Sequence, residues 1–187
     1  RIFRIFEGTN EINRMLIPDM LMKKSLKGEL PAWNAEVPDA ADGGDVLAEE
    51  AAIIRKAKAV CRGLFADAQT VFGKALGGEQ ELCAHLADIV IAIFGMESTL
   101  LRTRKMIQKN GEAKAAQAAR MTTAYVYEAA ETIRRLAKEA ICRLKKAEER
   151  ESALATLESS FRIAPVSLIE IKRGIAEQVI QAEKYLV

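Results

Sequence analysis

The sequence EQELCAHLADIVIAIFGMESTLLRTRKMIQK, residues 79–109, decides the fold class of this chain. Its apolar side chains recur every three or four positions, which places them on one face of a helix. They are Leu82, Leu86, Ile89, Val90, Ile93, Phe94, Leu100, Leu101 and Met106. Two glycines precede the run and Asn110–Gly111 follows it, so both ends carry residues that interrupt helices. The stretch therefore predicts one long amphipathic helix.

Similar apolar periods lie on both sides of this run. They predict long helices over about residues 45–76 and 112–149, a short helix over 151–161, and a last helix over 166–185. No strand-like run with turn chemistry follows residue 10. Long helices joined by short loops predict an all-α fold, an antiparallel four-helix bundle with the 151–161 segment as a cap or connector. Tyr125 and Tyr127 face different sides of their helix, so only one of them is expected in the core.

Composition narrows the class of protein. Half of the 187 residues are hydrophobic, 29% are charged and 5% are aromatic, a balance typical of a globular helical protein. The net charge is +2 and no basic cluster is interleaved with aromatic residues, so no nucleic-acid partner is expected. The longest apolar run, residues 89–95, is too short to span a bilayer.

Histidine and cysteine provide no metal-ligand pattern. Cys61, Cys83 and Cys142 are spread through helical runs without a C-x-x-C spacing, which argues against a disulfide framework or a zinc site. His85 is the only histidine, so a paired-histidine site is excluded. Glu81 precedes it by four residues, whereas the di-iron motif requires three. We therefore expect no metal site, a structural role for His85, and cysteines that act as small core residues.

The N-terminal quarter differs from the rest of the chain. A helix is predicted over residues 10–26, with Pro18 expected to kink or divide it. Residues 27–44 hold several glycines and prolines with no period, and are predicted to form a linker. Trp33, the only tryptophan, lies in this segment. A tryptophan at such a position is expected to anchor the linker onto a domain face.

The first fourteen residues, RIFRIFEGTNEINR, contain the candidate chemistry. Glu7 lies between an apolar stretch and Gly8; apolar surroundings raise the pKa of a carboxyl group toward the range of a general base. Gly8 lacks a Cβ, so a ligand can approach the backbone closely. Thr9 and Asn10 are helix-capping residues, and a helix that starts there points free N–H groups at an anion such as a cofactor pyrophosphate. The plainer alternative is that E-G-T-N is only a capped helix entry.

This run resembles the I-[FY]-E-G-T-x-x-I catalytic segment of flavin-dependent acyl-CoA dehydrogenases. The resemblance implies that Glu7 is the base that removes the α-proton of an acyl-CoA thioester, giving a trans-2-enoyl-CoA in fatty-acid β-oxidation. It implies that Gly8 lines the acyl-CoA pocket and that Thr9, Asn10 and Glu11 contact FAD. It also implies that electrons pass to an electron-transfer flavoprotein. The match begins at residue 1, so we expect the chain to start inside a larger enzyme and, alone, to be inactive and bind no FAD.

The resemblance also divides the chain. Residues 1–26 match the end of the dehydrogenase domain and its terminal helix, followed by the linker 27–44. Residues 45–187 resemble the extra helical domain of very-long-chain acyl-CoA dehydrogenases, and the ending SLIEIKRGIAEQVIQAEKY looks like the bacterial versions. In that subfamily the extra domain packs against the dehydrogenase body.

The expected location and partners follow from this resemblance. We expect a homo-oligomer, cytoplasmic in a bacterium or mitochondrial in a eukaryote. Peripheral association with the inner membrane is weakly supported, because no strongly amphipathic helix rich in Trp and Phe is present. The alternative function is a non-catalytic helical module for protein interaction or membrane association. Residues 1–26, severed from their usual partners, are expected to pack on the second domain or on another copy of the chain.

Overall fold

The computed structural model describes residues 8–33, 35 and 46–184. Its elements are α1 (Asn10–Leu26), α2 (Ala48–Phe72), a 3-10 helix η2 (Gly73–Gly78), α3 (Gln80–Asn110), α4 (Glu112–Leu144), α5 (Ala147–Ser160) and α6 (Leu168–Ala182). No strand occurs in these residues. The predicted all-α class is confirmed.

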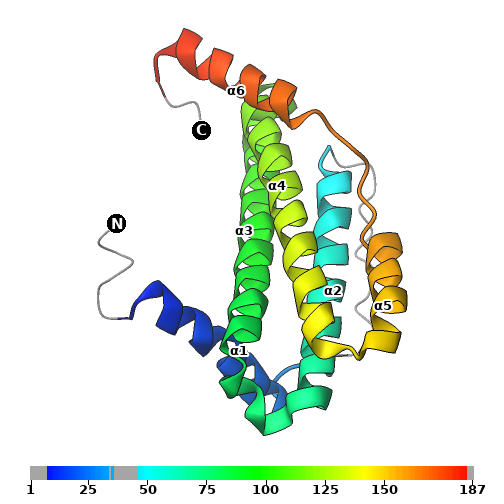
Figure 1. Cartoon of the computed structure of the whole chain (residues 1–187). Helices are drawn as coiled ribbons and strands as arrows, with labels where there is room; N and C mark the ends of the chain where they lie inside the picture. Colours follow the sequence, from blue (N-terminus) through cyan, green and yellow to red (C-terminus); the bar gives the residue numbers. More distant parts are fainter. Residues whose placement is uncertain (1–7, 34, 36–45, 185–187) are drawn as a thin grey trace.

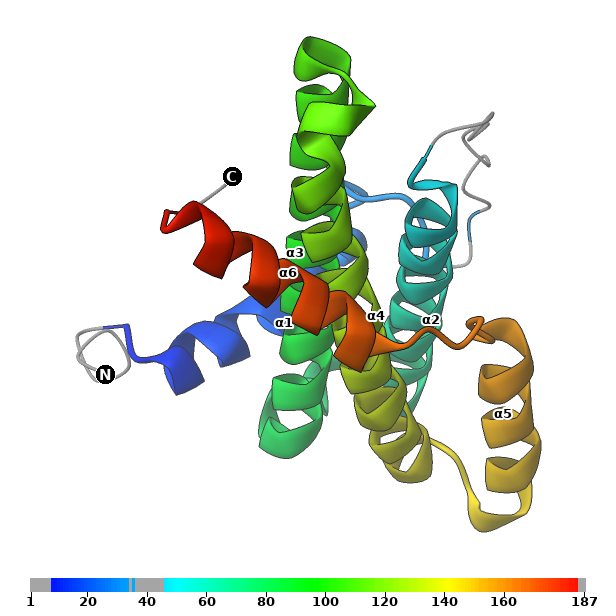
Figure 2. The same cartoon turned by 90° about the horizontal axis from the view of Figure 1, so that it is seen from above.

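Three long helices form the body of the molecule. α3 runs antiparallel to both α2 and α4, which point in the same direction, and α5 turns back beside them as a short antiparallel partner of α4 (Figure 1). α1 packs against the N-terminal half of α3, and α6 crosses the far end of α4 (Figures 1 and 2). α1 is one continuous helix with Pro18 buried inside it, so Pro18 does not divide it.

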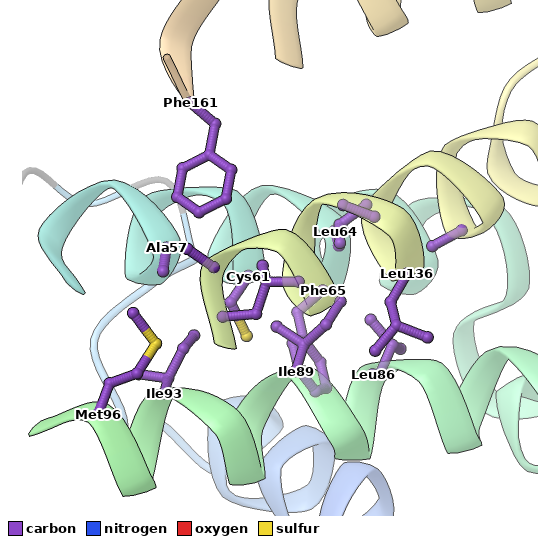
Figure 3. Packing of buried hydrophobic residues seen from close by; sticks show 14 of the residues in the cluster. Ala57, Cys61, Leu64, Phe65, Leu86, Ile89, Ile93, Met96, Leu136 and Phe161 are labelled. Carbon is purple, nitrogen blue, oxygen red and sulfur yellow. The ribbon is translucent and has the colours of Figure 1, made fainter. Parts of the chain in front are cut away.

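The core is a single cluster between α2, α3 and α4. Figure 3 shows Phe65 and Leu64 of α2 meeting Ile89 and Leu86 of α3, with Leu136 of α4 closing the layer. Each of these side chains is at most 4% exposed. Burial of a side chain of this size stabilises the fold by about 1.5–3 kcal/mol, so the cluster is the main source of stability.

The two short helices contribute differently from what their sequences suggest. Leu157 near the end of α5 and Phe161 just after it belong to the core, and Phe161 is fully buried. α6, expected as a full bundle member, contains no buried residue. It is held on α4 by the Gln117 amide, which donates to the Ile175 carbonyl at 3.2 Å, and by the Lys172–Glu128 ion pair. The 151–161 segment is thus a packed element of the bundle.

Two helices end earlier than predicted. α2 stops at Phe72 because Gly73 takes a φ of +50°, a left-handed conformation that glycine tolerates, and the chain then turns through η2. α4 stops at Leu144 because Lys145 is extended. The Lys145 ammonium donates to Asp67 of α2 at 2.7 Å, a tertiary contact that no local pattern reveals.

The α3–α4 contact contains buried hydroxyl groups. The Oγ1 atoms of Thr103 and Thr122 lie 2.7 Å apart, and Thr122 also donates to the Ala118 carbonyl at 2.9 Å. Both threonines are buried. Tyr127 is buried and Tyr125 is 42% exposed, which confirms that only one tyrosine enters the core.

Trp33 anchors the chain between α1 and α2. Its ring stacks on Phe65 of α2 with centroids 4.9 Å apart and an interplanar angle of 19°. The Arg62 guanidinium donates to the carbonyls of Ala32 and Trp33, each at 3.1 Å, and to that of Ala35. The predicted anchoring role of Trp33 is confirmed. Residues 34 and 36–44 of the predicted linker lie outside the described residues.

Among the described helices, α3 is the one long and apolar enough to cross a membrane by length and composition. The sequence analysis considered only the longest uninterrupted apolar run, residues 89–95, which is too short to span a bilayer. The mean hydropathy over a longer window of the helix is high enough to pass the test. α3 packs against α1, α2 and α4, and its inward residues form the core. A core helix passes the same test, so the finding is weak support for a membrane span.

Candidate functional site

The candidate site is the start of α1. Glu7, the predicted base, lies outside the described residues. The helix begins at Asn10 with Thr9 as its N-cap residue, as the sequence predicts. The Thr9 side chain makes no capping hydrogen bond, so the first backbone amides of α1 have no partner within the described residues. The partial positive charge of this helix N-terminus is offset in part by the Glu11 carboxylate in the first turn.

Gly8 supplies the turn that leads into this helix. Its φ is +76°, a conformation that side chains rarely adopt. The Asn13 amide donates to the Gly8 carbonyl at 2.5 Å, and the Asn13 backbone N–H donates to the Thr9 carbonyl at 2.9 Å. These bonds fix the bare backbone next to the helix start. Exposed glycine backbone beside free amides fits a phosphate-bearing ligand, and the structure brings Gly8, Thr9, Asn10 and Glu11 together within one turn.

A second feature, a groove, was missed by the sequence reasoning. It has a volume of about 550 Å³ and lies between α1, η2 and the start of α3. Its apolar lining residues are Ile12, Met15, Leu16, Pro18, Met22, Leu26, Leu76 and Cys83. Lys23 and Lys74 lie at it, together with Asp19, which pairs with Lys23 at 2.7 Å. The groove begins at Ile12, the last residue of the candidate motif.

Cys83 lines this groove as an unreactive thiol. Burial raises its pKa, and the carboxylates of Glu79 and Asp19 raise it further. Its Sγ donates to the Leu76 carbonyl at 3.3 Å. A thiol held in its neutral form is a weak nucleophile. The groove can therefore accept apolar groups but has no activated nucleophile at Cys83.

His85 lies outside the candidate site. Its Nε2 atom is 2.5 Å from an Oε2 of Glu139 on α4, a contact that ties α3 to α4. Hydrogen bonds from His85 and from Arg135 lower the pKa of the Glu139 carboxyl group. Within residues 8–33, 35 and 46–184, no group of three His, Cys, Asp or Glu side chains could hold a metal ion. The described contacts of His85 are structural.

Comparison with known proteins assigns the family. The family model "Acyl-CoA dehydrogenase, C-terminal domain" matches residues 53–159, which run from α2 into α5. The chain belongs to this family. The predicted relationship to the C-terminal part of an acyl-CoA dehydrogenase is thus confirmed, whereas the very-long-chain subfamily stays a prediction.

Two relatives match this family member over its whole length. A probable acyl-CoA dehydrogenase of Bacillus subtilis (strain 168) is 38% identical over 197 aligned positions, which cover 100% of this chain and 33% of that protein. The crystal structure of an acyl-CoA dehydrogenase complexed with FAD from Bacillus anthracis is 36% identical, with a TM-score of 0.90. That match covers 100% of this chain and 32% of the other. The chain therefore spans about a third of the length of these relatives.

Proposed function

We propose that this chain is the C-terminal part of a flavin-dependent acyl-CoA dehydrogenase that oxidises acyl-CoA thioesters to trans-2-enoyl-CoA in fatty-acid β-oxidation. The observation that carries the proposal is the match of the whole chain, motif and bundle together, to an acyl-CoA dehydrogenase complexed with FAD. In this proposal residues 1–26 end the dehydrogenase domain, residues 27–44 link it to the bundle, and residues 45–187 form the extra helical domain.

Glu7 is the proposed base. Its carboxylate removes the α-proton of the thioester, and the backbone N–H of Glu7 donates to the thioester carbonyl oxygen, where negative charge develops. The neighbouring apolar side chains and the acyl chain raise the pKa of the carboxyl group toward the working pH. Gly8 lines the acyl-CoA pocket, because its missing Cβ leaves room for the thioester beside the helix start.

The start of α1 is the proposed contact with FAD. The first backbone amides of the helix, which the Thr9 side chain does not cap, and the side chains of Thr9 and Asn10 would hold a phosphate-bearing part of the cofactor, while Glu11 would contact another part of the dinucleotide. When bound, FAD supplies the acceptor for the hydride that leaves the β-carbon. The 187 residues alone are proposed to bind no FAD, because they correspond to only a third of the FAD-bound relative.

The partners and location follow the same reasoning. An electron-transfer flavoprotein is the proposed electron acceptor, and the whole protein is proposed to be a homo-oligomer of the very-long-chain type. A bacterial cytoplasmic location fits the two Bacillus relatives. Mitochondrial location applies to a eukaryotic source, and peripheral contact with the inner membrane belongs to the same proposal.

The test compares Glu7→Gln with Glu29→Gln in the full polypeptide that includes this chain. Glu29 is exposed, lies just after the end of α1 at Leu26, and serves as the matched control. Rapid anaerobic mixing with acyl-CoA thioesters of increasing length follows bleaching of the flavin. Glu7→Gln is expected to slow bleaching by at least about 10²-fold while acyl-CoA still binds, because the change keeps size and removes the base. Glu29→Gln should match the unchanged protein.

Two outcomes would contradict the proposal. Bleaching by Glu7→Gln within about tenfold of the unchanged protein would place the base on another residue. Absence of bound flavin from the full polypeptide would favour the alternative of a non-catalytic helical interaction or membrane-association module.

A further inference from the structure

Residues 102–120, where α3 ends and α4 begins, form a strongly basic tip of the α3–α4 hairpin. This stretch contains six Lys and Arg residues and a single acidic residue, so its net charge is +5, whereas the whole chain carries +2. The remainder of the chain is therefore negative on balance, and the excess positive charge is concentrated here. We call residues 102–120 the hairpin tip. Its basic residues are Arg102, Arg104, Lys105, Lys109, Lys114 and Arg120.

Most of these side chains lack the partners that basic residues have elsewhere on the long helices. Every Lys and Arg of α2 has a partner, and so has each one of α4 after residue 120. Arg143, for example, donates to both carboxylate oxygens of Glu79, at 2.8 and 2.7 Å. In the hairpin tip Arg104 also has a partner. Within the described residues, no hydrogen bond or ion pair is formed by the side chains of Arg102, Lys105, Lys109, Lys114 and Arg120.

These five side chains are exposed and spread over neighbouring helices. Arg102, Lys105 and Lys109 follow one another at spacings of three and four residues, so they lie on one side of α3 along about 10 Å of helix. On α4, Arg120 lies beside α6, since a Cβ added to Gly174 would be 3.7 Å from its Nη1 atom. The basic surface therefore extends from the end of α3 to the edge of α6.

Local helix energetics explains only part of this charge. Lys109 lies in the last turn of α3, where the negative end of the helix dipole favours a cation. Lys114 lies in the first turn of α4, where the same effect favours acidic residues such as Glu112. Repulsion among like charges destabilises the compact state. An anionic partner would relieve that repulsion, so the hairpin tip is suited to bind one.

The composition and shape of the hairpin tip favour an acidic protein surface over other anions. None of the exposed large hydrophobic side chains of the described residues lies between 102 and 120, so the tip has no such group to insert into a bilayer. The stretch contains no aromatic residue on which an unpaired base could stack. The charges are spread over two helices, so a single small anion would not meet all of them, whereas an extended acidic surface would.

We infer that the hairpin tip is a docking site for an acidic surface of another protein. Such charges mainly speed the encounter and make it sensitive to salt. The tip lies at the other end of α3 from α1 (Figure 1). Arg14 of α1 pairs with Asp88, and Lys105 lies about 25 Å further along the same helix. This docking site is therefore separate from the candidate site, and the inference does not depend on the proposed function.

Fluorescence anisotropy of a fluorescein-labelled octaglutamate peptide tests the inference. The peptide is titrated with the full polypeptide and, in parallel, with the 187-residue chain. The tip variant combines Lys105→Glu and Lys109→Glu. The matched control combines Lys24→Glu and Lys27→Glu, which makes the same change in net charge at exposed positions near the end of α1. Circular dichroism first shows that each variant keeps the helix content of its parent.

Both parent proteins should bind the peptide at about 20 mM salt, and the affinity should fall at least about tenfold by about 200 mM. The tip variant should bind at least about tenfold more weakly, and the milder pair Lys105→Gln and Lys109→Gln should show a smaller loss. The control should stay within about twofold of its parent. This graded loss at the tip, with an unchanged control, would support the inference.

Four results would overturn it. The first is no binding by the parent proteins at low salt. The second is an equal loss in the tip variant and the control, which would show that net charge alone attracts the peptide. The third is binding by the 187-residue chain but not by the full polypeptide, because the tip would then be covered by the rest of the same protein. The fourth is tighter binding to phosphatidylglycerol vesicles or to duplex DNA than to the peptide, lost in the same tip variant.

Discussion

The Thr103–Thr122 contact predicts an asymmetric response to substitution by valine. Thr122 donates its hydroxyl hydrogen to the Ala118 carbonyl at 2.9 Å, so the hydrogen between the two threonine oxygens comes from Thr103. Thr122→Val therefore leaves the Thr103 hydroxyl buried without this acceptor. Thr103→Val removes only the donor, and the Thr122 hydroxyl keeps its bond to Ala118.

The magnitudes follow from this difference. A buried donor left unsatisfied costs about 1–3 kcal/mol, whereas loss of one ordinary hydrogen bond costs about 0.5–1.5 kcal/mol. We expect Thr122→Val in the first range and Thr103→Val in the second. The double variant replaces both hydroxyls by methyl groups of the same shape, so its cost should be smaller than the sum of the two.

Urea unfolding of the 187-residue chain, followed by circular dichroism, measures these costs as free energies of unfolding. In thermal unfolding, each 1 kcal/mol corresponds to about 2–4 °C for a chain of this size. Thr132→Val is the matched control, because Thr132 is exposed and bonds only the Glu128 carbonyl of its own helix; its effect should stay within about 0.5 kcal/mol. A larger cost for Thr103→Val than for Thr122→Val would refute the hydrogen assignment, and additive costs would refute the coupling.

Three further predictions concern packing, thiols and pH. Phe161→Ala should lower the free energy of unfolding by about 3–5 kcal/mol in urea titration, because the ring is fully buried where α5 joins the core; a loss below about 1 kcal/mol would show that α5 does not hold the core. DTNB should detect Cys142 in the folded chain and the two buried cysteines only after denaturation, since burial raises the pKa of Cys61 to about 12. Hydrogen bonding from Lys138 lowers the pKa of Glu158 below 4.5. The stability from this pair should be present above pH 4.5 and be lost as the pH falls through the lowered pKa, and Glu158→Gln should flatten that part of the acid-unfolding curve.

The helices could be predicted from the sequence because each long helix buries one face. The spacing of the apolar residues reflects that burial, and it predicted both ends of α1 and α3 to within one residue. It failed where a hydroxyl group lies in the core. On α4 the structure buries Thr122 and Val126, whereas the apolar side chain of Met121 is half-buried and that of Tyr125 is exposed. Thr122 is polar by type and becomes a core residue only because Thr103 of another helix satisfies it.

The roles of α5 and α6 depend on tertiary contacts that a period does not encode. α6 has the clearer apolar face but lies across α4 with no buried residue. α5 has a weak pattern, and its position is set by the extended Lys145 and by Leu157 and Phe161 at the other end. The Arg150 guanidinium donates to the Lys145 carbonyl at 3.1 Å and closes this turn.

The candidate site was predictable only where local chemistry determines the structure. Thr9 as N-cap and the helix start at Asn10 follow from local chemistry and are confirmed. The roles of Glu7, Gly8 and Glu11 rest on resemblance and stay predictions. The groove beside α1 could not be predicted, because it forms between residues far apart in the sequence, such as Leu16 and Leu76.

The anchoring of Trp33 and Arg62 has a consequence for proteolysis. Arg62 of α2 bonds three carbonyls of the segment after α1, and Trp33 stacks on Phe65 of the same helix. α1 itself is attached to α3. A protease that cleaves between residues 36 and 45 would therefore break the covalent connection between α1 and the bundle without separating the two pieces. They should co-elute in size-exclusion chromatography and part only in denaturant.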